Sequence, residues 1–115
     1  MPGETTGRLL VVDDEPPLLR LLQHYLERSG FQVDTCQDPQ SAIELLQQNP
    51  AAYHTAVVDQ TLKGMNGEEL IAALRGHNPQ LKGIITSGYP YRPRGAGIQF
   101  LQKPFLPKDL GALLT

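Results

Sequence analysis

The sequence has little of several features that mark secreted, membrane-bound and nucleic-acid-binding proteins. It contains one cysteine, Cys36, so no disulfide can form within the chain, and we interpret this residue as a small buried hydrophobe. No apolar stretch approaches the ~20 residues of a membrane span, and no signal-peptide pattern is present. Ten basic and 12 acidic side chains give a formal charge of -2, too small for a surface that binds nucleic acid or anionic lipid. We therefore predict a cytoplasmic protein that contacts neither membranes nor nucleic acids directly.

The length of 115 residues suits one domain with its own hydrophobic core. Residues 1–7 are polar and contain glycine and proline, so we predict a flexible leader over 1–7 and a single domain over 8–115. The sequence has no internal repeat and no low-complexity tract.

Two short apolar runs stop abruptly on carboxylates. Thr55 to Val58 leads directly into Asp59, and Leu9 to Val12 leads into Asp13 and Asp14. Continuous runs of this length are typical of strands buried on both faces. In open α/β sheets the chemistry lies at the carboxyl end of such strands. Both acidic turns are therefore candidate site positions.

Helical patterns alternate with further short strands along the rest of the chain. We predict additional strands near 31–36, 81–86 and 98–101, and helices near 16–28, 39–48, 68–74 and 107–114. Leu18, Leu22, Tyr25 and Leu26 provide the apolar face of the first helix. Strands and helices in alternation predict an α/β fold with a parallel sheet joined by right-handed crossovers.

Four of the predicted strands end on residues that can act on phosphate. Asp13-Asp14, Asp59, Ser87 and Lys103 all fall on the carboxyl edge of the predicted sheet. Three carboxylates held together repel one another, and a hard divalent cation relieves this repulsion, so we predict a Mg²⁺ site, with Mn²⁺ as the alternative ion. Asp59 could then attack a phosphoryl donor and form an acyl phosphate, while Ser87 and Lys103 bind the phosphoryl oxygens.

The motifs VVDDE, VVDQTLKGMNG, the Ser-Gly of ITSGY, and FLQKPF resemble the receiver domain of two-component response regulators, from Arg8 to about Leu113. The resemblance implies a doubly wound, flavodoxin-like, five-stranded parallel sheet of order 2-1-3-4-5. It implies a phosphorelay module that is not itself an enzyme and that receives its phosphoryl group from the phosphohistidine of a sensor histidine kinase or a histidine phosphotransfer protein.

The resemblance also implies a role for each site residue. Asp59 is the phosphoacceptor, and Ser87 and Lys103 contact the phosphoryl group. The metal ligands are Asp13, Asp14, Asp59 and the backbone carbonyl of Thr61, whereas Ser87 and Phe100 form the conformational switch. It further implies a cis peptide bond between Lys103 and Pro104.

Two departures from the family pattern stand out. Lys63 occupies a position that is usually proline. Only 16 positions separate Ser87 from Lys103, and that interval contains two prolines and several glycines, so we expect the usual fourth helix to be shortened or absent. Such shortening resembles the receivers attached to hybrid sensor histidine kinases.

Two other functions compete with a phosphoaccepting receiver. A degenerate receiver that only binds other proteins would lack an acid, the hydroxyl or the lysine, and all are present. A phosphatase with Asp59 as nucleophile, like the dehalogenase-like hydrolases, would carry a second acid two residues on, where this chain has Thr61.

The spacing of the three histidines does not suit a metal site; they are His24, His54 and His77. We also expect the ring of Tyr89 to shield the acyl phosphate from water, the alternative being a ring that points to solvent.

Overall fold

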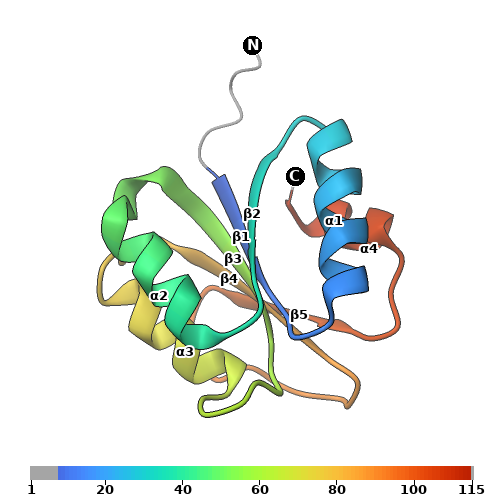
Figure 1. Cartoon of the computed structure of the whole chain (residues 1–115). Coiled ribbons are helices and arrows are strands. Elements are labelled where there is room, and N and C mark those ends of the chain that lie inside the picture. Colours follow the sequence, from blue (N-terminus) through green and yellow to red (C-terminus); the bar gives the residue numbers. More distant parts are fainter. Residues whose placement is uncertain (1–7, 115) are drawn as a thin grey trace.

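The computed structural model describes residues 8–114 and shows one five-stranded parallel sheet of order β2-β1-β3-β4-β5, as predicted (Figure 1). The predicted leader at 1–7 lies outside the described residues. The strands are β1 (Arg8–Val12), β2 (Gln32–Cys36), β3 (Tyr53–Asp59), β4 (Lys82–Ser87) and β5 (Ile98–Gln102). All neighbouring strands pair in parallel.

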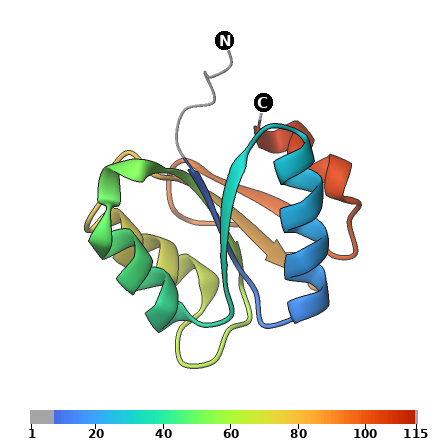
Figure 2. The same cartoon turned by 45° about the horizontal axis from the view of Figure 1, so that its top comes forward.

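Helices cover both faces of the sheet (Figures 1 and 2). They are α1 (Pro16–Arg28), α2 (Pro39–Gln48), α3 (Gly67–Arg75) and α4 (Pro107–Leu114), with a short 3₁₀ turn at Pro50–Ala52. One face packs against α1 and α4, and the opposite face packs against α2 and α3. No described helix is both long enough and apolar enough to cross a membrane.

The helices begin where the sequence provides caps. Pro39 occupies the first turn of α2, and Asp38 accepts a hydrogen bond from the backbone N–H of Ser41 at 2.8 Å. At α3, Asn66 and Glu69 form a reciprocal capping box. These caps satisfy backbone groups that a helix leaves unpaired, and they fix the loops that precede each helix.

Alternate residues of each central strand enter two separate cores. Val12, Val58 and Ile85 face α2 and α3, and the preceding residue in each strand faces α1 and α4. The predicted apolar face of α1 needs one correction. Leu19 is also buried there, whereas Leu18 and Tyr25 are partly covered and pack against the same core.

No helix forms between β4 and β5. Residues 88–97 contain only bends and turns, which confirms the expected loss of the family's fourth helix, so the label α4 belongs to the last helix of the chain. Proline lacks a backbone donor and glycine loses much conformational entropy, so this composition disfavours a helix. Without that cover, β5 is only partly buried along its length.

Candidate functional site

Strand register brings the predicted site residues to one edge of the sheet. Val12 pairs with Val58, so Asp13 and Asp59 follow at neighbouring strand ends. Ser87 pairs with Gln102, which directly precedes Lys103. Neighbouring strands end at the same level, and a polar residue stands at or just after the end of each one. The polar residues therefore meet at this edge.

Asp59 is nearly buried, with 6% of its surface exposed. Its Oδ1 accepts a hydrogen bond from the backbone N–H of Thr61 at 3.2 Å, and its Oδ2 lies 3.5 Å from Lys103 Nζ. Burial raises the pKa of Asp59 above its ordinary value, against the opposing effects of the Thr61 N–H and the Lys103 ammonium. The carboxylate is thus poorly hydrated and available for a reaction.

Lys103 joins the two buried carboxylates. Its ammonium donates to Asp13 Oδ2 at 2.7 Å, and Asp13 Oδ1 accepts from the backbone N–H of Glu15 at 2.9 Å. Desolvation lowers the pKa of Lys103, but the hydrogen bond and charge of Asp13, together with Asp59, outweigh it and raise the pKa overall. The lysine is therefore held charged beside Asp59. The Lys103–Pro104 peptide bond is cis, as expected.

The acids form a cluster that suits a divalent cation. One carboxylate oxygen from each of Asp13, Asp14 and Asp59 lies within 4.8 Å of the others, and these acids make up the one such group of potential ligands within residues 8–114. Asp14 is exposed, whereas the other two are buried. Oxygen ligands of this kind suit Mg²⁺. Lys103 compensates a single negative charge, so two remain uncompensated, and a divalent cation would neutralise both.

Ser87 is also buried, with 2% exposed. Its Oγ accepts a hydrogen bond from the backbone N–H of Tyr89 at 3.0 Å, and its carbonyl accepts from Lys103 N at 2.7 Å. Phe100 is partly buried on the same face of the sheet, where its ring packs against Tyr91. The carbonyl of Thr61 as a metal ligand, and the switch roles of Ser87 and Phe100, stay predictions.

The sequence pattern missed what shapes the loop after Asp59. A Cβ at Gly67 would lie 2.7 Å from the carbonyl oxygen of Asp59, so only glycine allows α3 to begin this close to the site. Gln60 holds the same junction, because its carbonyl accepts from Gly67 N and its side chain accepts from Glu68 N. In the sequence, the only sign of this constraint is the glycine at position 67, eight residues after Asp59.

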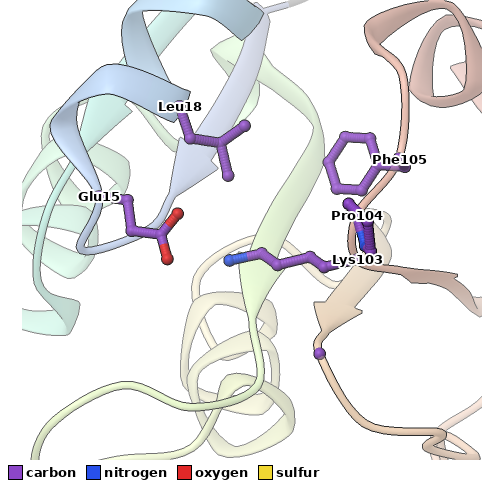
Figure 3. Close-up of a pocket in the computed structure, with 6 residues that line it drawn as sticks. Glu15, Leu18, Lys103, Pro104 and Phe105 are labelled. Atoms are coloured by element: carbon purple, nitrogen blue, oxygen red, sulfur yellow. The ribbon is translucent and has the colours of Figure 1, made fainter.

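A cleft of about 480 Å³ opens beside the site (Figure 3). It is lined by Glu15, Leu18, Gly88, Lys103, Pro104 and Phe105. Figure 3 shows the Lys103 side chain extending from the β5 side of the cleft toward Glu15 on the α1 side. The cleft therefore opens beside the charged edge of the sheet, next to the start of α1.

Other singled-out residues lie away from this edge or have ordinary roles. Cys36 is buried, and desolvation together with nearby acids raises its thiol pKa to about 11, so it is unreactive. Tyr89 is 73% exposed, which favours a ring that points to solvent, and shielding of the acyl phosphate stays a prediction. Lys63 is exposed and lines a separate groove with Asp38 and Met65.

The family model for the response regulator receiver domain matches residues 9–115. The chain belongs to the response regulator receiver domain family. Receiver domains of this family act as phosphoacceptors, bind Mg²⁺ at an acidic pocket and work with histidine kinases in two-component systems. The expected family and fold are thereby confirmed.

Known receivers resemble this one over nearly its whole length. The receiver domain of the hybrid histidine kinase CckA superimposes with a TM-score of 0.85, at 26% identity, covering 94% of this chain and 95% of that one. A response regulator from Burkholderia pseudomallei, solved with a phosphorylated aspartic acid, calcium ion and citrate, gives 0.81 at 26% identity and covers 95% and 66%.

Among curated proteins, the photosynthetic apparatus regulatory protein RegA of Cereibacter sphaeroides is 36% identical over 81 residues. The aligned region covers 70% of this receiver and 43% of RegA. This receiver spans less than half the length of the curated relatives it matches.

Proposed function

We propose that this receiver accepts a phosphoryl group on Asp59 from a phosphohistidine of a sensor histidine kinase or a histidine phosphotransfer protein. The observation that carries the proposal is the placement of the nearly buried Asp59 carboxylate 3.5 Å from the Lys103 ammonium, beside a cluster of acids. In this function the chain is a substrate of phosphotransfer and a switch, and it is not an enzyme in its own right.

In the transfer, a carboxylate oxygen of Asp59 attacks phosphorus and forms a P–O bond. The P–N bond to the partner imidazole breaks, and the departing nitrogen keeps the electron pair and takes a proton from solvent. Lys103 would bind one phosphoryl oxygen from its present position near Asp59 Oδ2. Ser87 Oγ would turn from the Tyr89 N–H toward another oxygen.

The acid cluster would hold Mg²⁺, or Mn²⁺ as an alternative. The ligands would be carboxylate oxygens of Asp13, Asp14 and Asp59, joined by the carbonyl of Thr61. When bound, the ion supplies positive charge that offsets the repulsion between the acids and the phosphoryl oxygens. Lys103 then keeps its own charge available for the phosphoryl group.

The partner would dock over the cleft beside α1. Leu18 and Phe105 line that opening, and two large exposed hydrophobic residues lie close to them in sequence: Leu21 three residues after Leu18, and Leu106 directly after Phe105. Exposed apolar groups around a charged site are common at protein interfaces. A partner seated there would bring its histidine to the mouth of the cleft that Lys103 lines.

Phosphate uptake on Asp59 tests this proposal. The protein would be incubated with acetyl phosphate, with Mg²⁺ or with EDTA, and analysed by intact-protein mass spectrometry. We expect one added phosphate only with the metal, and none on Asp59→Asn. Asp38→Asn is the matched control, because asparagine caps a helix as well as aspartate does. An Asp59→Asn protein that still gained the phosphate would refute the assignment.

Phosphate uptake in this assay, together with the amount of inorganic phosphate released, separates the two competing functions. A degenerate receiver would take up no phosphate in any condition. A phosphatase would release inorganic phosphate over many turnovers, which requires a general acid near Asp59. Two residues after Asp59 the chain has Thr61, whose hydroxyl is a poor acid. We therefore expect the phosphorylated protein to lose its phosphate slowly, without repeated turnover.

A further inference from the structure

The segment that replaces the family's fourth helix is tied to α3 at two places. At its C-terminal end, the guanidinium of Arg75 donates to the carbonyl oxygens of Ala96 at 2.7 Å and Gly97 at 3.1 Å. Nearer its middle, the segment binds Glu68, in the first turn of α3. An acid at one end of α3 and a base at the other thus hold residues 88–97 without any helix of their own.

Glu68 uses both of its carboxylate oxygens in this attachment. Oε1 accepts from the hydroxyl of Tyr91, and Oε2 accepts from the backbone N–H groups of Arg94 at 2.8 Å and Gly95 at 2.6 Å. A Cβ at Gly95 would lie 2.8 Å from Ile98 Cδ1 and 3.3 Å from Glu68 Oε2, so a larger residue there would have to displace one of these side chains. We call this group, made of Glu68, Tyr91, Arg94 and Gly95, the Glu68 latch.

The latch is connected to the phosphoacceptor edge through both neighbouring strands. Gln60, the residue after Asp59, accepts from the backbone N–H of Glu68 at 3.1 Å. On the other strand, Ser87 Oγ accepts from Tyr89 N, two residues before Tyr91. If the Ser87 side chain rotates to bring its Oγ to a phosphoryl group on Asp59, that oxygen leaves the Tyr89 N–H, and the start of the segment loses an attachment.

The latch also restrains an aromatic residue of β5. The ring of Tyr91 packs against that of Phe100, with centroids 6.3 Å apart and planes tilted by 59°. As long as the Tyr91 hydroxyl binds Glu68, this ring stays over Phe100, and a change in the position of Phe100 must displace it. The present packing of Phe100 and the hydrogen bonds of Glu68 therefore occur together, and both are lost if the segment moves.

We propose that the Glu68 latch holds residues 88–97 against α3 while Asp59 is unphosphorylated, and that phosphorylation of Asp59 releases it. This inference rests on the proposed function. The released segment would then be the surface that reports the phosphorylation state, in place of the missing helix. The latch opposes the shape change, so weakening it should favour the phosphorylated conformation.

Amide hydrogen exchange of Arg94 and Gly95 tests the latch, measured by NMR before and after treatment with phosphoramidate and Mg²⁺. In the unmodified chain we expect exchange of both amides to become about tenfold faster on phosphorylation, as one charge-assisted hydrogen bond is lost. Tyr91→Phe and Glu68→Gln should show faster exchange beforehand, because phenylalanine lacks the hydroxyl and glutamine has one acceptor oxygen instead of two.

Tyr89→Phe is the matched control. It removes a hydroxyl from the same segment, but this side chain is 73% exposed and lies outside the latch. In this variant the amides of Arg94 and Gly95 should therefore exchange as fast as in the unmodified chain. The two latch variants should also take up phosphate from phosphoramidate about threefold faster, an effect that loss of a purely structural contact would not produce.

The outcomes separate this inference from the function beneath it. Normal phosphate uptake by mass spectrometry, with unchanged exchange at Arg94 and Gly95, would overturn the latch and leave Asp59 as the phosphoacceptor. Latch variants phosphorylated no faster than the control would also count against it. If neither the unmodified chain nor any of the variants takes up phosphate, the proposed function and the latch are both overturned.

Discussion

The centre of the sheet and its β5 edge are built differently. β1 and β3 are buried along nearly their whole length and provide Asp13, Asp14 and Asp59 at their ends. β5, at the edge, is only partly buried, and the segment before it is attached through side-chain hydrogen bonds of Glu68 and Arg75. The acids thus depend on strands packed from both sides, and a helix next to the edge strand can be lost without disturbing them.

Truncating one leucine packed against the centre and one on the edge strand should show this difference in stability. Leu74 of α3 is fully buried, so Leu74→Ala should destabilise the fold by about 2–5 kcal/mol. Leu101 of β5 is partly exposed, so we expect Leu101→Ala to cost about 1 kcal/mol, since less apolar surface is lost. Urea unfolding curves give both values. Equal costs would show that the edge strand is packed as tightly as the centre.

Low pH should detach the segment and leave the central strands in place. Partial desolvation opposes ionisation of Glu68, but hydrogen bonds from Tyr91 and two backbone N–H groups, with the Arg94 charge, lower its pKa below the ordinary 4.5. Because the pKa of Glu68 is lower in the folded state, its stabilising contribution is fully present above the ordinary value of 4.5. It is lost as the pH falls through the pKa of the folded state.

NMR chemical shifts of Arg94 and Gly95 against pH measure this loss. We expect both amides to titrate together below pH 4.5, and the titration to disappear in Glu68→Gln. The amides of the fully buried strand residues Val58 and Ile85 should not move in the same range. A midpoint above the ordinary glutamate value would contradict the hydrogen bonds assigned to Glu68.

The smallest effect is expected at Tyr89. The sequence had led us to expect that Tyr89→Ala would shorten the life of the acyl phosphate, because the ring would shield it from water. With 73% of this residue exposed in the structure, we now expect less than about a twofold change in the dephosphorylation rate. The rate of phosphate release, measured with equal Mg²⁺ on both proteins, checks this. A much faster variant would show that the ring swings over the site after phosphorylation.

Much of this molecule could be predicted from local patterns. Apolar runs that stop on Asp13, Asp59 and Ser87 marked three strand ends, and caps such as Asp38 marked helix starts. The lack of a helix after Ser87 followed from its prolines and glycines. Local patterns did not provide the burial of Leu19 or the exposure of Tyr89, since both depend on how finished elements pack.

The element types and the kinds of residue at the strand ends follow from the sequence, because hydrophobic periodicity and turn chemistry act over a few residues. Only the tertiary structure decided which of these groups touch. Lys103 binds Asp13 across 90 positions, and Glu68 binds Gly95 across 27. Such contacts depend on strand register and on the path of a loop, and no local pattern encodes either. Register is set by packing of the whole core, so the pairing of Lys103 with Asp13 and Asp59 appears only when all five strands are aligned.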